Sequence, residues 1–223
     1  IDKKGILDPD VMAPIFPTRK LGEELSVMAQ MGVDALNQAL ASAGLTGADL
    51  DGVICACSNF QRVYPAIAIE IQSAVGIKAG LGKRIVVVNV EITSAHLNWR
   101  NRDSHFIFGD VAAATIIEET DTPTGYEILD SKLWTEFSTN IKNEFGFMDR
   151  SEFLHAKTSM YPDLNEPVTD KLFLQEGRKV FREVCPKVSE IISTHLAENN
   201  ISTNKEKKLW LHQANINMID LIL

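Results

Sequence analysis

A short polar run near the carboxyl end, His212-Gln213-Ala214-Asn215, is the part of the sequence best suited to chemistry. A neutral imidazole donates one hydrogen bond and accepts another near neutral pH, so His212 is suited to polarise a carbonyl or pass a proton. A lone histidine is more often a core residue bonded to backbone. Here the amide side chains of Gln213 and Asn215 stand beside it, directly after the apolar run 209–211. We therefore predict a functional histidine in a turn at the end of a buried strand.

The spacing of apolar residues indicates the elements that position this histidine. Residues 21–44 repeat apolar side chains every three or four positions, which predicts an amphipathic helix that ends at a glycine. The unbroken apolar run 53–57 predicts a short strand covered on both faces. Pro65 opens a second helix over 65–75, and the β-branched run 85–90 predicts the clearest strand.

The rest of the sequence predicts further strands and helices. Residues 135–169 are irregular and polar, which indicates either a cap or lid or a packed surface loop. A helix is expected over 170–199, bent or broken at Pro186 because proline removes a backbone donor. Strands are expected at 106–108, 112–117, 126–134 and 208–211, and a last helix begins at residue 216. Strands that alternate with helices predict an α/β fold with a largely parallel or mixed sheet.

Composition and charge exclude several classes of function. The chain has 223 residues, 45% of them hydrophobic and 23% charged, which is enough apolar material for a globular core. The net charge of −8 argues against a nucleic-acid partner. No apolar stretch reaches membrane-spanning length and no signal peptide opens the sequence, so we expect no membrane partner. The three cysteines form no paired framework, which predicts a cytoplasmic location, and the histidine spacings predict no metal site.

Four stretches, which follow one another along the chain in the family's order, resemble the β-ketoacyl-acyl carrier protein synthase III family of the thiolase-like superfamily. The run HQAN after an apolar strand is similar to the family's histidine motif. The run YPAIAIEIQSAVGI at 64–77 looks like the family's "IQ…LGI" helix. The run FIFGDVAAA at 106–114 looks like its "FGDGA" turn, and LQEGRKVF at 174–181 looks like its "GxxVF" helix.

The resemblance implies a layered αβαβα fold and a condensing acyltransferase of fatty-acid or related polyketide-like biosynthesis. In the family, a cysteine takes an acyl group from acyl-CoA, and a histidine and an asparagine stabilise the enolate formed when malonyl-acyl carrier protein loses CO2. His212 matches that histidine. The resemblance also implies a homodimer and no cofactor besides the acyl-CoA and malonyl-acyl carrier protein substrates. It further implies contacts with the carrier protein or its pantetheine arm for Gln213, Ala214, Asn215, Ile216 and Asn217, and with the channel or CoA for Gly177, Phe181 and Arg102.

Several of these positions have structural alternatives. Gly177 inside a helix costs about 1 kcal/mol against alanine, so it indicates either a close approach by another group or tight helix packing. Arg102 beside Asp103 can also be a surface turn, and Asp110 is expected to pin the Gly109 turn. The basic residues at 178, 179, 182, 205, 207 and 208 are either a docking face for an acidic carrier protein or solvated surface.

The family's nucleophilic cysteine has no clear counterpart. Cys57 lies in ACSNF, which mimics the family's "ACSGF" box, but this run precedes the "IQ" helix instead of following it. Cys55 and Cys57 share one face of a predicted buried strand, where cysteine acts as a small hydrophobe, and Cys185 lies in a helix. We predict that the nucleophile segment is missing between Gly80 and Leu81. The family's second asparagine is also absent, and Asn217 replaces a frequent family arginine.

These breaks predict an incomplete thiolase-like fold in two parts. Residues 1–170 are expected to form an N-terminal half with the cap near 135–169, and 171–223 to begin a C-terminal half. Two alternatives remain open for the function. One is a non-catalytic homologue that binds acyl-CoA or acyl carrier protein, and the other is a thiolase-superfamily synthase of secondary metabolism.

Overall fold

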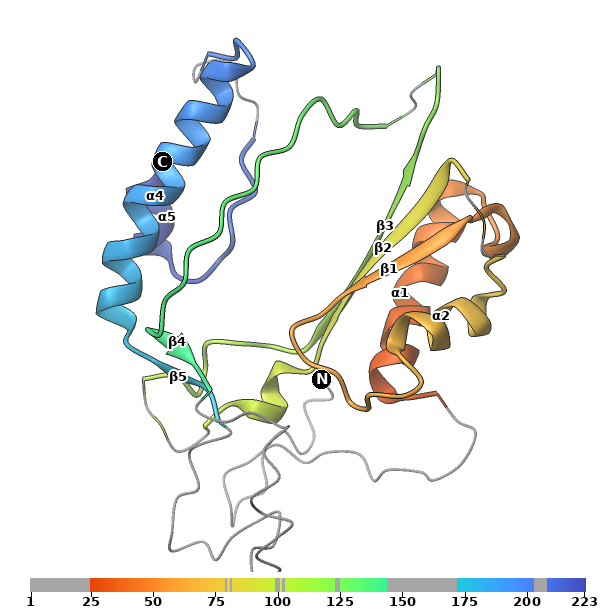
Figure 1. Cartoon of the computed structure of the whole chain (residues 1–223), viewed down its shortest axis with the longest axis horizontal. Coiled ribbons are helices and arrows are strands. Elements are labelled where there is room, and N and C mark those ends of the chain that lie inside the picture. The colour runs from red at the N-terminus through yellow and green to blue at the C-terminus, as the bar shows by residue number, and fades with distance from the viewer. Residues whose placement is uncertain are drawn as a thin grey trace, which may run out of the picture. The chain divides into compact units, whose positions relative to one another are not determined.

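A computed structural model describes residues 25–78, 80, 82–98, 101, 103–122, 125–143, 172–202 and 208–223. The chain divides into two compact units (Figure 1). The first unit holds the described residues up to 95 together with 108–122, and the second holds those of 96–107 and 125–223. None of the helices in these ranges has the length and apolar character that a membrane span requires. The predicted division at residue 170 stays a prediction.

The first unit opens with helix α1, Val27–Ala43, as the apolar spacing predicts. The Ser26 hydroxyl caps its start by accepting a hydrogen bond from the Ala29 amide at 3.1 Å. Gly44 ends it with φ of 68°, a left-handed conformation that glycine adopts without steric cost. The predicted apolar stripe is the buried face of this helix.

Three strands form the sheet of the first unit in the order β1-β2-β3. Strand β1, Gly52–Ala56, is parallel to β2, Arg84–Glu91, and β2 is antiparallel to β3, Val111–Glu118. A parallel pair needs a crossover connection, and helix α2, Ile67–Val75, provides it. Short 3₁₀ turns, η1 at Gly47–Asp49 and η2 at Thr93–His96, complete this part of the chain. The mixed sheet and the elements predicted at 53–57, 65–75, 85–90 and 112–117 are confirmed.

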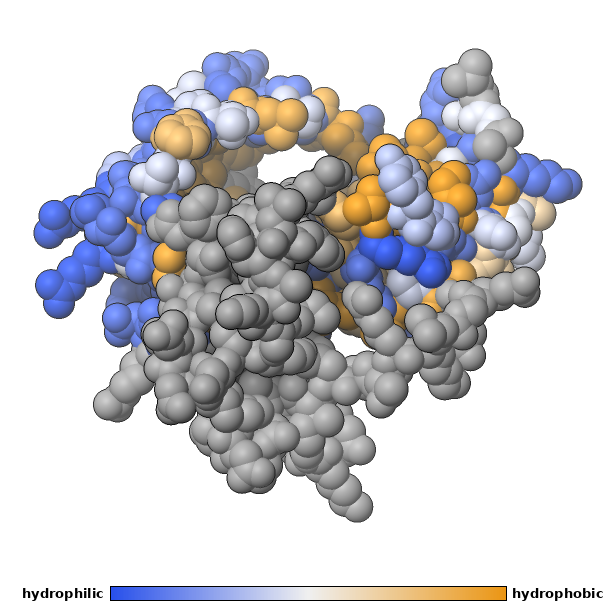
Figure 2. All heavy atoms as spheres, turned by 60° about the horizontal axis from the view of Figure 1, so that its bottom comes forward, coloured by the Kyte–Doolittle hydropathy of each residue, from blue (hydrophilic) through white to orange (hydrophobic). Residues whose placement is uncertain are grey.

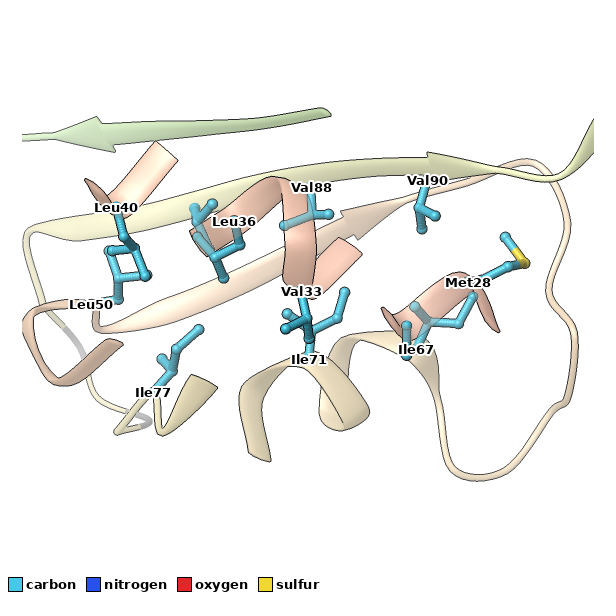
Figure 3. Close-up of a cluster of buried hydrophobic side chains, with 12 residues drawn as sticks. Met28, Val33, Leu36, Leu40, Leu50, Ile67, Ile71, Ile77, Val88 and Val90 are labelled. Carbon is cyan, nitrogen blue, oxygen red and sulfur yellow. The ribbon is translucent and has the colours of Figure 1, made fainter. Parts of the chain in front are cut away.

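The core of the first unit lies between the sheet and its two helices (Figure 3). Val88 and Val90 point from β2 towards α1 and α2, and Leu36 and Ile71 are fully buried against them. Gly32 lets the helices meet, because an added Cβ would lie 2.7 Å from the Ile71 Cδ1 atom. This packing confirms the apolar stripes, but the prediction that β1 is covered on both faces is wrong. Ile54 is 55% exposed, since both helices lie on the opposite face.

The second unit contains two helices and a short two-stranded ribbon. Helix α4, Gly177–Glu198, runs without interruption through Pro186, and α5 spans Ile216–Ile222. Strand β4, Ile141–Lys142, pairs antiparallel with β5, Leu174–Gln175. The helix predicted from residue 170 therefore begins seven residues later. The strands predicted at 106–108, 126–134 and 208–211 are also wrong, because no described strand pairs with these segments.

Residues 125–140, which we call the strap, run beside α4 and are held to it by polar side chains. Asp130 accepts a hydrogen bond from the Asn199 amide at 3.0 Å and lies 3.8 Å from His195. Lys132 pairs with Glu198 at 2.6 Å. Farther along, Lys187 lies 5.1 Å from the centre of the Trp134 ring, and Ser138 and Asn140 donate to Glu183. The contacts follow α4 from its C-terminal end towards its N-terminal end.

Candidate active site

His212 lies in an exposed turn immediately before α5. The Ala214 amide donates to the His212 carbonyl at 3.0 Å, which closes the turn. No side chain or backbone group in the described ranges forms a hydrogen bond with the His212 imidazole ring. The preceding segment is irregular, and Trp210 is 73% exposed with Lys208 4.9 Å from the centre of its ring. The structure thus confirms the turn and the helix after it, and replaces the predicted buried strand by exposed coil.

Two amide side chains lie beside this histidine, as predicted, and they differ in their contacts. Asn215 caps α5, because its Oδ1 accepts a hydrogen bond from the Met218 amide at 3.0 Å. This leaves the Asn215 NH2 group available. Gln213 is exposed and has no partner among the described residues, and Ile216 and Asn217 are also exposed. The segment therefore presents donors to a ligand instead of burying them in a core.

The predicted channel residues lie on the first turns of α4. Gly177 is the first residue of the helix and Phe181 is half-buried one turn later. Together with Arg178 and Arg182 they line an open depression of about 270 Å³. Nothing lies within 4 Å of a Cβ built on Gly177, so neither the close approach nor the tight packing predicted for it occurs in the described part of the chain. Arg102 lies outside the described residues.

The electrostatics of this depression favour an anion. Arg178 and Arg182 are exposed, stand one helical turn apart and form no salt bridge with any residue that the structure describes. Lys179 is already paired with Glu176. Guanidinium groups bind phosphate and carboxylate groups through paired hydrogen bonds. The second unit thus places donors around His212 just before α5, and on α4 two arginines whose charge suits an anion. These two helices contact each other (Figure 1).

The three cysteines are placed as small core residues. Burial, with the neighbouring Cys57 as the second cause, raises the pKa of Cys55 to about 12. Burial also raises the pKa of Cys57. Cys185 is 1% exposed inside α4. A nucleophilic thiol needs a lowered pKa and access to substrate, so the structure agrees with the prediction that Cys57 is not the nucleophile.

Asp110 has the structural role predicted for it. Its carboxylate accepts hydrogen bonds from the Ser94 amide at 2.9 Å and the Ser94 hydroxyl at 2.6 Å. Thr93 donates to the Gly109 carbonyl at 2.9 Å, so the turn before β3 is fastened to η2. His105 lies in a turn, with its Nδ1 atom 3.0 Å from the Asn101 carbonyl oxygen.

Comparison with known proteins places the chain in a family. Residues 66–136 match the family model for 3-oxoacyl-acyl carrier protein synthase III. The whole chain aligns over 250 positions with a Pseudomonas aeruginosa protein named β-ketodecanoyl-acyl carrier protein synthase, at 44% identity and over 68% of that protein. The chain belongs to the β-ketoacyl-acyl carrier protein synthase III family. A Rhizobium johnstonii member of that name is 30% identical over 86% of the chain and 64% of the relative.

Solved structures of β-ketoacyl-acyl carrier protein synthase III enzymes share the fold. A Pseudomonas aeruginosa enzyme of that name matches with a TM-score of 0.73 at 20% identity, over 87% of this chain and 64% of that one. The priming β-ketosynthase of the R1128 polyketide pathway matches with a TM-score of 0.63 over 92% of this chain. The thiolase-like α/β class is therefore confirmed. The chain spans about two thirds of the length of these relatives.

The chain is also shorter than its family relatives inside the aligned region. The alignment with the 44% identical relative has 250 positions, while this chain has 223 residues and is covered completely. At least 27 positions of the relative therefore have no counterpart here. A strand, a turn and a helix fit within such a length, and the predicted location between Gly80 and Leu81 stays a prediction.

The sequence did not predict the polar contacts that hold the strap to α4. The partners of the strap lie far apart in the chain, as Asp130 and Asn199 do, so local spacing carries no signal for them. The spacing of Arg178 and Arg182 did reveal a basic face. Only the structure shows that Gly177 and Phe181 line the same depression as the two arginines.

Proposed function

We propose that the function is the condensing chemistry of its family, a decarboxylative Claisen condensation of an acyl-CoA with malonyl-acyl carrier protein. The observation that supports this most strongly is the exposed His212 beside the Gln213 amide and the Asn215 NH2 group, neither of which has a partner among the described residues, in a chain that belongs to the family. In this proposal His212 serves the malonyl half of the reaction. The acyl half requires a thiol, which we expect in the nucleophile segment predicted to be missing from this sequence between Gly80 and Leu81.

The malonyl half needs a group that stabilises negative charge on a thioester oxygen. When the bond between the methylene carbon and the carboxylate breaks, CO2 leaves and its electron pair becomes an enolate. The imidazole of His212 donates a hydrogen bond to the enolate oxygen, where the charge develops. The enolate carbon then attacks the acyl thioester, expels the thiol and forms the β-ketoacyl product.

Acyl carrier protein and acyl-CoA are the partners that fit the depression on α4. Arg178 and Arg182 line its rim without an ion-pair partner among the described residues, and an acidic carrier protein or the phosphate of a pantetheine arm matches them in charge. Phe181 offers an apolar wall for the arm. The exposed segment Gln213–Asn217 would supply further polar contacts beside His212.

A medium-chain primer is the acyl group that the comparisons favour. The 44% identical relative is named for a β-ketodecanoyl product. A ten-carbon product takes two carbons from malonate, which leaves eight for the primer. We propose octanoyl-CoA or a thioester of similar length as the substrate, because three relatives at only 26–30% identity carry the general β-ketoacyl name without a chain length.

Three further features complete this proposal. We propose a homodimer and a cytoplasmic location, which rest on the family resemblance and on the unpaired cysteines. We also propose that no cofactor besides the substrates is needed. A polyketide-type synthase is the second candidate, and the likeness in fold to a priming ketosynthase favours it.

The proposal is tested by release of CO2 from carboxyl-labelled malonyl-CoA or malonyl-acyl carrier protein. The change His212→Ala is expected to lower the rate by about 10²–10³-fold, the usual effect of removing one placed oxyanion donor. The matched control is His195→Ala, because His195 lies on α4 among the strap contacts. Equal rates for wild type and His212→Ala would show that His212 is structural.

A further inference from the structure

Strand β1 forms one edge of the sheet in the first unit (Figure 1). It pairs with β2 on one side, and no strand among the described residues pairs with its other side. An edge strand offers backbone N–H and C=O groups to another chain, and proteins usually guard such an edge with charged residues, proline or a bulge. The sequence of β1, GVICA, contains no charge and no proline. This edge is therefore suited to pairing with a further strand.

The exposed side chains of β1 and of the loop that follows it are largely apolar. Ile54 is 55% exposed on the sheet face opposite the helices, and Phe60 and Val63 are exposed in the loop before α2. Tyr64 in the same loop is 87% exposed. Tyrosine is enriched among the residues that contribute most to protein interfaces. The strand and the loop are continuous in the chain, and we call residues 52–64 the edge surface.

Polar contacts hold the loop of the edge surface in place. Glu91 at the end of β2 accepts hydrogen bonds from the Ser58 hydroxyl and the Asn59 side chain, each at 3.0 Å. The one charged residue of the edge surface is Arg62, and it pairs with the buried Glu70. The apolar side chains thus stand on a fixed loop, and the charge of this surface is neutralised within the first unit.

Charge distinguishes between the possible occupants of the edge surface. The chain has a net charge of −8, so two copies are expected to meet through a surface that lacks acidic groups. Residues 52–64 contain no Asp or Glu. An acidic carrier protein instead needs cations such as Arg178 and Arg182. The strand at the other edge, β3, suits self-pairing less well, because it ends at Glu118 and Glu119 follows.

We propose that the edge surface binds a second copy of this chain, with the two β1 strands paired antiparallel about a twofold axis. This inference rests on the homodimer proposed above and names the surface that forms it. An axis at Ile54 places this residue opposite Ile54 of the second copy, and Val53 opposite Cys55, so no like charges face each other. The two three-stranded sheets then join into one continuous sheet.

Sedimentation equilibrium of the full chain tests the association. We expect the wild type to have twice the mass of one chain, which is 24.7 kDa. Ile54→Lys sets two like charges at the axis and should weaken the dimer by at least about 10-fold. Tyr64→Lys changes a side chain that the fold leaves exposed, and should weaken it as well. The matched control is Ile117→Lys, which adds the same charge to the same sheet face on β3 and should leave the association unchanged.

The outcomes separate this inference from the rest of the proposal. Circular dichroism verifies that each variant is folded. A wild-type dimer that Ile54→Lys and Tyr64→Lys leave intact would overturn the inference while the proposed homodimer stands, and a monomeric wild type would overturn both. Neither result depends on CO2 release, which tests His212 separately.

Disulfide cross-linking tests the position of the axis. Ile54→Cys should form a covalent dimer under mild oxidation, because the two copies of this residue face each other across a pair of antiparallel strands. Wild type and Ile117→Cys should stay without a cross-link. A cross-link in Ile117→Cys, or none in Ile54→Cys, would contradict the pairing of β1 with β1.

Discussion

The two units of the chain bury their side chains in different ways. In the first unit, α1 and α2 cover one face of the sheet, and its central valines are completely buried. In the second unit, α4 is half-buried and the strap is held to it by exposed polar groups. The difference teaches that the first unit supplies stability, while the second presents the groups suited to chemistry.

Both units also expose hydrophobic side chains at the surface (Figure 2). In the first unit they include Ile54 and Ile117 on the sheet face opposite the helices, and Phe60 and Tyr64 in the loop before α2. In the second unit they lie on the strap and around α5, including Tyr126, Ile128, Leu129, Leu133, Phe137, Leu209, Trp210, Ile216 and Leu221.

Truncation of a core side chain is expected to give the largest difference between the units. Leu36→Ala removes a side chain with no exposed surface and should lower the free energy of unfolding by about 2–5 kcal/mol. Leu133→Ala on the strap removes one that is 94% exposed and should change it by less than about 0.5 kcal/mol. Urea unfolding followed by circular dichroism measures both. Similar losses would contradict the division of roles.

Glycine-to-alanine substitutions should show a smaller difference in stability between the two units. A Cβ on Gly47 would lie 1.9 Å from the Val75 carbonyl oxygen, so Gly47→Ala must shift backbone and should cost about 1–3 kcal/mol. Gly177→Ala meets nothing within 4 Å and should be neutral or stabilise by up to about 1 kcal/mol. Thermal unfolding of the two variants provides the comparison, and a destabilised Gly177→Ala would reveal a neighbour at this position.

Substitution of a carboxylate should likewise lower the free energy of unfolding more in the first unit than in the second. Glu70 is 4% exposed, accepts from the Ser26 amide and hydroxyl at 3.0 and 2.8 Å, and pairs with Arg62. Glu70→Gln should therefore lower the free energy of unfolding by about 1–3 kcal/mol. Glu183→Gln in the second unit loses only exposed contacts to Ser138 and Asn140, worth about 0.2–1 kcal/mol. Chemical unfolding at neutral pH would detect an inverted order.

The strap should also give a small pH-dependent effect. The hydrogen bond from the Asn199 side chain, followed by that from the Ser131 amide, lowers the pKa of Asp130. A lowered folded-state pKa stabilises the fold above the unfolded pKa, near 3.8, and this contribution disappears as the pH falls through the folded value. Wild type should exceed Asp130→Asn in stability at pH 7 and converge with it below about pH 4. A gap that widens at low pH would contradict this assignment.

The sequence predicted the first unit well because its elements are periodic and their apolar faces are buried. The stripe of α1, the run of β2 and the stop at Gly44 all appear as expected. The strands predicted at 126–134 and 208–211 failed for a physical reason. A strand needs a partner for its backbone groups, and sequence alternation does not show whether one exists.

The site was predicted in part. The turn at His212 and the helix after it were visible in the HQAN run, and Asn215 adds a helix-capping role that its position before an apolar run could have indicated. The depression on α4 could be found only in the structure, because the sequence does not show that the two arginines line one hollow with Phe181 and Gly177.

Hydrogen exchange with a malonyl-CoA analogue that cannot lose CO2 tests most directly whether the chemistry lies in the second unit. Mass spectrometry would compare exchange with and without the analogue. Our account predicts slower exchange in peptides that contain His212 and the first turns of α4, and unchanged exchange in β1 and β2. Protection confined to the sheet of the first unit, with none around His212, would contradict it.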